Sequence, residues 1–120
     1  MNQPITHKQA LLLRTDLKMR RGKEIAQGAH ASMKAMIENR DHPDVQAWLA
    51  GPFAKIALGV GSEAELDELV SKAEAAGIVT ATIIDAGRTE FGGVPTLTAA
   101  AIGPASVDRI DAITGHLRLR

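Results

Sequence analysis

The sequence predicts a single α/β domain, and three observations agree on this fold class. The length of 120 residues lies in the usual range of one domain. Hydrophobic residues make up 45% and charged residues 23% of the chain, which is typical of a globular protein rather than a disordered one. Short apolar runs alternate with segments whose apolar residues recur at helical spacing. This alternation favours parallel strands joined by right-handed helical crossovers, with helices on both faces of one sheet.

Cap and turn residues set the boundaries of the predicted elements. Pro43 suits the first turn of a helix, Ser62-Glu-Ala-Glu65 is a capping-box signature, and Gly77 and Gly115 suit helix ends. The last strand follows its predecessor without an intervening helix and is therefore free to pair antiparallel. After a flexible N-terminus at 1–7, the predicted order is a strand at 10–14, a helix from about 22 to 40, a short helix from 43 to 50, a strand at 53–60, a helix from 62 to 77, strands at 78–84 and 96–102, and a helix at 104–114.

The long first helix carries two stripes of side chains. Six apolar residues recur at helical spacing and are predicted to face the core, namely Ile25, Ala26, Ala29, Met33, Met36 and Ile37. Four polar residues at i, i+4, i+7 and i+11 are predicted to line up beside them, namely Lys23, Gln27, His30 and Lys34.

Charge and composition limit the classes of function. The net charge is zero, yet residues 14–34 hold six basic residues against two acidic ones, whereas residues 62–76 hold five acidic residues against one basic. The absence of cysteine excludes disulfides, thiolate nucleophiles and cysteine-ligated zinc. The four histidines lack metal-ligand spacing, so no metal site is predicted. Neither a leader nor a membrane-spanning run is visible, and a cytoplasmic protein is expected.

Three segments are predicted to converge at one edge of the sheet, outside the carboxyl ends of the parallel strands, where ligands of such sheets bind. The amino end of the long helix points there and, with Lys18 and Lys23, suits an anion or a developing oxyanion. Asp85 is placed to orient a water molecule or to hold Lys18 charged. The strand ends deliver Thr15, Asp16 and Lys18 on one side and Asp85, Arg88 and Thr89 on the other.

A competing motif lies at residues 59–64, where Gly59-Val-Gly61-Ser-Glu-Ala64 matches the G-x-G-x-x-A pattern of dinucleotide sites. Acidic residues crowd the first turn of the helix that follows, and they would repel a pyrophosphate. A nucleotide-binding module is therefore the weaker alternative. Nucleophile-elbow, Walker and H-E-x-x-H signatures are absent from the sequence.

Four motifs follow one another along nearly the whole chain. They are T-D-L-K-M-x-x-G-K-x-x-A-Q-x-x-H-A at 15–31, D-A-G-R-T at 85–89, A-I-G-P at 101–104 and T-G-H-L-R-L at 114–119. Together they resemble the archaeal/eukaryotic-type peptidyl-tRNA hydrolase family. The resemblance implies an α/β/α sandwich around a four-stranded mixed sheet. It also implies a cofactor-independent hydrolase that cleaves the ester between peptide and tRNA, recycles tRNA during translation and forms a homodimer.

The resemblance also implies roles for individual residues. Asp85 is assigned to the attacking water, directly or through a threonine hydroxyl, with His30 as the rival base, and Lys18 to the oxyanion. The expected catalytic group is Lys18, Asp85, Thr89, Thr96 and His30, and the expected substrate-binding group is Arg20, Arg21, Lys23, Gln27, Lys34 and Arg88.

One segment departs from the family pattern. Glu90 stands where glutamine is usual, and Phe91-Gly-Gly-Val-Pro95 replaces the more usual short turn, containing Pro and Gly, before Thr96. These changes lie at the rim of the expected site. They are the feature that would favour the alternative function, a catalytically inactive adaptor that binds tRNA or protein on the same fold.

Overall fold

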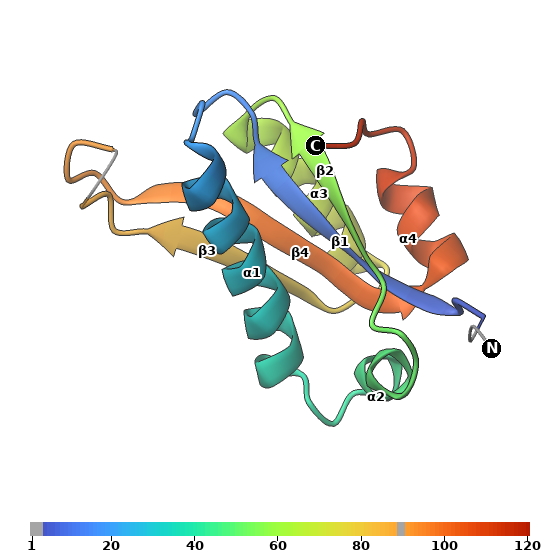
Figure 1. The fold of residues 1–120 in the computed structure, drawn as a ribbon. Coiled ribbons are helices and arrows are strands. Elements are labelled where there is room, and N and C mark those ends of the chain that lie inside the picture. Colours follow the sequence, from blue (N-terminus) through green and yellow to red (C-terminus); the bar gives the residue numbers. More distant parts are fainter. Residues whose placement is uncertain (1–3, 89–90) are drawn as a thin grey trace.

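The computed structural model of the chain describes residues 4–88 and 91–120, and its elements follow in the predicted order (Figure 1). β1 begins three residues before the predicted strand. β4 continues four residues beyond its predicted end, because residues 105–106 extend the ladder to β1, and the last helix therefore starts later. The elements are β1 (His7–Arg14), α1 (Arg21–Glu38), α2 (Pro43–Ala50), β2 (Lys55–Val60), α3 (Glu63–Ala75), β3 (Thr80–Asp85), β4 (Thr96–Ser106) and α4 (Val107–Thr114).

The four strands form one mixed sheet in the order β2-β1-β4-β3. β1 pairs parallel with β2, whereas β4 pairs antiparallel with both β1 and β3, which confirms the expected antiparallel last strand. β1 and β3 therefore end at the same edge of the sheet, and β4 begins there. Asp85 and Thr96 lie opposite each other in the ladder at this edge.

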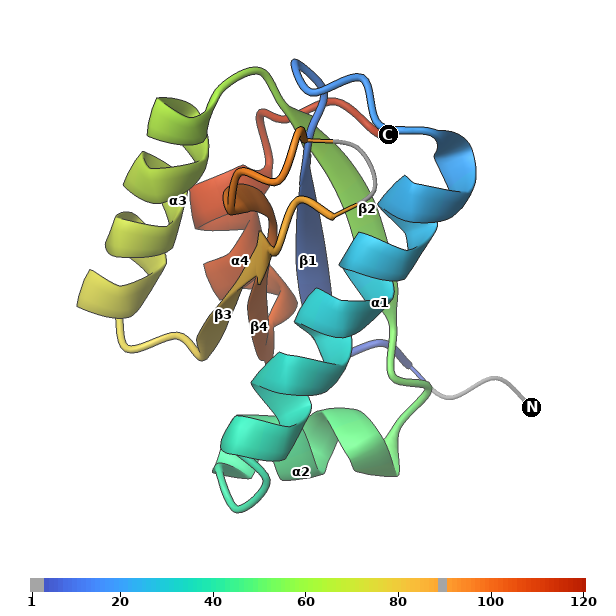
Figure 2. The ribbon, with the colours of Figure 1, turned by 90° about the vertical axis from the view of Figure 1, so that its left-hand side faces the viewer.

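Helices cover both faces of the sheet, as predicted. α1 and α2 lie on one face and α3 and α4 on the other, so that the sheet is the middle of three layers (Figures 1 and 2). Each pair of helices closes a separate hydrophobic core. Leu13, Ala31 and Val45 belong to the core under α1 and α2, whereas Leu12, Leu66 and Ile110 belong to the larger core under α3 and α4.

The predicted core-facing stripe of α1 is wrong. Ala26 and Ala29 are exposed, Met36 is only partly buried, and Ile25, Met33 and Ile37 are 65%, 60% and 50% exposed. Helical periodicity locates an apolar stripe without revealing what the stripe contacts. The face that packs on the sheet instead combines small residues, which allow close approach, with polar residues that find partners there, namely Glu24, Gln27, Gly28, Ala31, Ser32 and Ala35.

Two buried polar residues, Ser32 of α1 and Gln9 of β1, form hydrogen bonds with each other between the helix and the sheet. Ser32 Oγ donates to Gln9 Oε1 at 2.5 Å, and Gln9 Nε2 donates to the Gly103 carbonyl at 3.2 Å. Gln9 is fully buried in β1. Because each group has a partner, α1 can bury a polar side chain here without an unpaired donor or acceptor.

The last three residues of the chain cover the free edge of β2. The Gly59 N–H donates to the Arg118 carbonyl at 3.0 Å, and the Arg120 N–H donates to the Ala57 carbonyl at 2.9 Å. Leu119 pairs antiparallel with Leu58. The tail thus occupies backbone groups that would otherwise be open to another strand. Within residues 4–88 and 91–120, no helix combines the length and apolar character needed to span a bilayer.

The orientation of α1 can be tested by making the same change, alanine to leucine, at two positions of the helix. Ala31 is fully buried and Ala26 is exposed on the same helix. We expect Ala31→Leu to lower the free energy of unfolding by about 1–3 kcal/mol through overpacking, and Ala26→Leu to change it by less than about 0.5 kcal/mol. Urea unfolding of both variants at one protein concentration checks this. The reverse ranking would mean that α1 packs through its apolar stripe.

Candidate active site

The candidate site centres on an ion pair between α1 and the end of β3. Lys23 Nζ donates to Asp85 Oδ1 at 2.8 Å, and both side chains are more than four-fifths buried. The second carboxylate oxygen, Oδ2, accepts the Gly87 N–H at 2.8 Å in a tight turn. Asp85 is thus held on both sides, and its partner is Lys23 rather than Lys18.

These contacts keep Asp85 ionised. The hydrogen bond from Lys23 lowers the pKa of Asp85 most, the Gly87 N–H lowers it further, and partial burial opposes them; charge interactions with Lys23 and His30 add to the lowering. The folded-state pKa therefore lies below the unfolded one. The resulting stabilisation is fully present above the range where an ordinary aspartate titrates, about pH 4, and is lost as the pH falls through the lowered pKa.

A second polar contact, between Gln27 and Thr98, joins α1 to β4 one helical turn after Lys23. Thr98 is fully buried, and its hydroxyl donates to Gln27 Oε1 at 2.5 Å. The ladder between β3 and β4 shifts register there: Ile83 pairs with Ala99 and Ile84 with Leu97, so Thr98 has no residue opposite it in the ladder, and its hydroxyl also lies 3.4 Å from the Ile83 carbonyl. A bulge of this kind re-aims a side chain beside a site.

Sequence reasoning selected Thr96 and missed Thr98. Thr96 lies opposite Asp85 in the ladder, but its hydroxyl donates to the Val94 carbonyl at 2.8 Å and so serves the preceding loop. Only a polar residue within the apolar run of β4 could have drawn attention to Thr98. Thr89, the other threonine expected here, and Glu90 lie outside the described residues.

The polar stripe predicted for α1 does lie toward β3 and β4. Besides Lys23 and Gln27, Lys34 reaches β3, where its ammonium donates to the Thr82 carbonyl at 2.8 Å. His30 lies between them on the helix, is exposed, and is close enough to Asp85 to lower the pKa of that carboxyl. The stripe therefore lines the flank of α1 that faces the end of β3.

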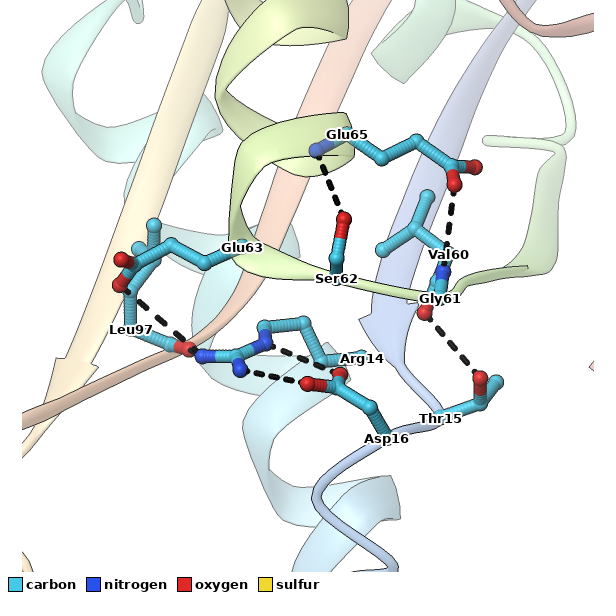
Figure 3. Close-up of polar contacts among 9 residues, drawn as sticks. All are labelled: Arg14, Thr15, Asp16, Val60, Gly61, Ser62, Glu63, Glu65 and Leu97. Carbon is cyan, nitrogen blue, oxygen red and sulfur yellow. Dashed lines mark hydrogen bonds and ion pairs between the residues drawn. The ribbon is translucent and has the colours of Figure 1, made fainter.

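A guanidinium-centred cluster holds the ends of β1 and β4 together (Figure 3). Arg14 donates to both carboxylate oxygens of Asp16, at 3.1 and 2.7 Å, and to the Leu97 carbonyl at 2.9 Å. Its Nη1 also lies 3.9 Å from Glu63 at the start of α3. The hydrogen bonds raise the pKa of Arg14 and lower that of Asp16. The cluster thereby fixes β4 at the residue that precedes Thr98.

Lys18 is exposed on the turn after β1. Its φ of 52° lies in the left-handed region, and strained residues of this kind concentrate at functional sites. Among the described residues, none forms a hydrogen bond or an ion pair with its ammonium. Nothing in the part of the chain that is described neutralises this charge.

The remaining expected cations lie at the start of α1 and after the end of β3. Arg20 is the N-cap residue and Arg88 follows Asp85 by three positions, and both are exposed. Arg21 instead lines a hollow of about 600 Å³ over β1 and β2, on the other flank of α1 from Asp85. The structure thus separates Arg21 from the Lys23–Asp85 pair.

Phe91, in the loop before β4, lies near the Lys23–Asp85 ion pair. The Lys23 ammonium lies 5.9 Å from the centre of its ring, which is within reach of a cation–π interaction. The loop that departs from the family pattern therefore contributes a contact at the rim. Sequence reasoning noted Phe91 without placing it against Lys23.

The competing motif at 59–64 has a local structural explanation. A Cβ on Gly59 would lie 2.8 Å from Thr15 Cγ2, so a larger residue there would displace the Thr15 side chain. Ser62 Oγ accepts the Glu65 N–H at 3.1 Å, which caps α3 with its own side chain (Figure 3). Among residues 4–88 and 91–120, no three His, Asp or Glu side chains are grouped to hold a metal ion.

Comparison with known proteins places the chain in a family. The family model described as "Peptidyl-tRNA hydrolase PTH2" matches residues 7–120. The chain belongs to the peptidyl-tRNA hydrolase 2 family. The matched range includes every residue of the candidate site.

Individual members of the peptidyl-tRNA hydrolase family align over nearly the whole chain. The peptidyl-tRNA hydrolase of Methanocaldococcus jannaschii is 42% identical over 114 residues, which cover 93% of this chain and 98% of that protein. The peptidyl-tRNA hydrolase of Aeropyrum pernix is 44% identical over 120 residues, covering 94% and 95%. A probable peptidyl-tRNA hydrolase 2 of Dictyostelium discoideum is 40% identical over 116 residues, covering 93% of this chain and 54% of that protein.

The contrast between the two threonines is testable. Thr98→Val removes the hydroxyl that Gln27 accepts from, and a buried amide oxygen left without a donor costs about 1–3 kcal/mol. We expect that loss in the free energy of unfolding for Thr98→Val, and a change below about 0.5 kcal/mol for Thr96→Val, whose hydroxyl bonds an exposed loop. Chemical denaturation measures both. Equal effects would contradict the buried contact.

Proposed function

We propose that this chain hydrolyses the ester between the peptide and tRNA of peptidyl-tRNA and releases free tRNA for translation in the cytoplasm. Membership of the family and the names of its relatives support the reaction. The observation that carries the proposal is the ionised Asp85 carboxylate, held by Lys23 at the sheet edge where the motif at 15–31 meets the motif at 85–89. No specific observation favours the inactive adaptor.

Ester hydrolysis needs an oriented water and a stabilised oxyanion. The water attacks the ester carbonyl carbon, the bond to the ribose oxygen breaks, and that oxygen takes a proton, which leaves a peptide carboxylic acid and tRNA. The lowered pKa makes Asp85 a weak proton acceptor, so we assign it to orienting the water. Lys18 and the N–H groups of the first turn of α1 stabilise the oxyanion.

His30 remains the rival base, because it is exposed on the same helix flank as Lys23. Thr96 and Thr89 are proposed as hydroxyl relays to the water. Substrate binding is assigned to Gln27 and to five basic residues at the N-cap of α1, along α1 and after β3. They would contact tRNA phosphates, which makes binding salt-dependent and largely independent of sequence. The assigned set is Arg20, Arg21, Lys23, Gln27, Lys34 and Arg88.

Turnover of an N-acetyl-aminoacyl-tRNA tests the reaction. We expect wild-type protein to release free tRNA, and Asp85→Asn and Lys18→Gly each to lower kcat/KM by at least about 100-fold. Lys72→Ala, on the opposite helix layer, should retain full activity. A kcat profile with no inflection in the histidine range would exclude His30 as the base.

Lys18→Gly also separates activity from stability. Because Lys18 has a positive φ, glycine should keep the free energy of unfolding or raise it by up to about 1 kcal/mol. Loss of turnover in this variant would thus not reflect loss of fold. A folded wild-type protein without turnover would contradict the proposed reaction.

We also propose a homodimer formed through the apolar face of α1 and α2. Large apolar side chains are exposed together there, and a hollow of about 560 Å³ lies between them; monomers rarely expose such a patch. A second copy suits it because twofold pairing matches one apolar face with itself and leaves the Asp85 flank open. The exposed residues are Ile25, Met33, Ile37, Leu49 and Phe53.

Sedimentation velocity tests the dimer. Met33→Glu places two like charges in a twofold interface and should give a monomer, whereas Ala64→Glu, exposed on α3 in the opposite layer, should remain dimeric. A wild-type monomer at micromolar concentration would rule out this interface.

A further inference from the structure

The end of the chain reaches the helix turn that carries Lys23. Arg120 Nε donates to Glu24 Oε1 at 2.5 Å and its Nη2 donates to Oε2 at 3.1 Å. Glu24 is buried in α1 and directly follows Lys23. In Figure 2 the end marked C lies beside the first turn of α1. Two consecutive residues therefore tie this turn to different segments, Lys23 to β3 and Glu24 to the tail.

The tail that carries Arg120 is itself fixed. Backbone hydrogen bonds of 3.0 and 2.9 Å join residues 118 and 120 to β2, on either side of the Leu58–Leu119 pair. The guanidinium is thus presented to Glu24 from a strand rather than from a loose end.

Contacts from these side chains matter at the first turn of α1, because its N-cap residue supplies no side-chain cap. Arg20 occupies the N-cap position and makes no capping hydrogen bond through its side chain, although capping residues normally stabilise this end of a helix. Within the described residues, Arg120 is the one ion-pair partner of Glu24. Removing the guanidinium would leave a buried carboxylate unpaired, and such a group moves toward water.

We propose that Arg120 is a positioning residue of the site: through Glu24 it fixes the first turn of α1 and thereby holds Lys23 against Asp85. The inference rests on the proposed hydrolase function of that site. Arg120 itself contacts no reacting atom. Its effect reaches the reaction through the placement of Lys23 and of the N–H groups that are assigned to the oxyanion.

Three variants test the proposal. Arg120→Ala should lower kcat for N-acetyl-aminoacyl-tRNA about tenfold, the scale expected for a slight misplacement, with KM changed less than twofold. Arg120→Lys should restore most of kcat. Arg118→Ala, the neighbouring basic residue on the same tail, should leave kcat unchanged. All are compared at a temperature where circular dichroism shows each protein folded.

A second readout separates positioning from general stability. The pKa of the Asp85 carboxyl, followed by carbon NMR, depends on Lys23 and His30 of α1 and on the Gly87 N–H. We expect this pKa to rise in Arg120→Ala and to return in Arg120→Lys. A lower melting temperature with kcat and the Asp85 pKa unchanged would overturn the proposal, as would a fall in kcat without the pKa change.

Should Arg120→Ala fail to fold, Glu24→Gln removes the buried charge while keeping the shape of the side chain, and the same rise in the Asp85 pKa is expected. Should wild-type protein show no turnover, the proposed function fails, and the Asp85 titration alone decides whether Arg120 positions Lys23.

Discussion

The close approach of α1 to the sheet determines where every polar group of the site lies. Gly28, Ala31 and Ala35 present almost no side chain to the strands, so the helix settles directly on β1 and β4. At that distance its flanking side chains reach the strand ends. Lys23 meets Asp85 and Gln27 meets Thr98 without intervening residues. Larger residues on the contact face of α1 would move the helix away from the sheet and separate Lys23 from Asp85 and Gln27 from Thr98.

Charge interactions fix the ionisation state and position of the groups that this packing brings together. Asp85 stays ionised because an ammonium and a backbone N–H hold its two oxygens, while the Arg14 guanidinium neutralises Asp16 and fixes β4 next to Thr98. The charged groups that are paired thus fix the positions of the helix and strand ends. Exposed cations such as Lys18 face solvent, where they can bind an anionic ligand, and ester hydrolysis on tRNA requires both fixed catalytic groups and a cationic surface.

Local signals in the sequence predicted the order of elements, because cap residues, glycines and apolar runs are local. They also predicted the polar stripe of α1, whose members share a face through helical spacing alone. The apolar stripe was assigned to the core wrongly, since periodicity does not say which flank meets the sheet. Gln27 with Thr98, and Glu24 with Arg120, are pairs 71 and 96 residues apart, and register and tail placement create them.

The central claim is that Lys23 holds Asp85 ionised at the site. Carbon NMR titration of the Asp85 carboxyl in wild-type protein and in Lys23→Met measures this directly, with Lys34→Met as the control on the same helix flank. We expect a wild-type pKa of Asp85 below the ordinary aspartate range, a clear rise in Lys23→Met and little change in Lys34→Met. An Asp85 pKa that is ordinary in wild type, or unmoved by the loss of Lys23, would contradict it.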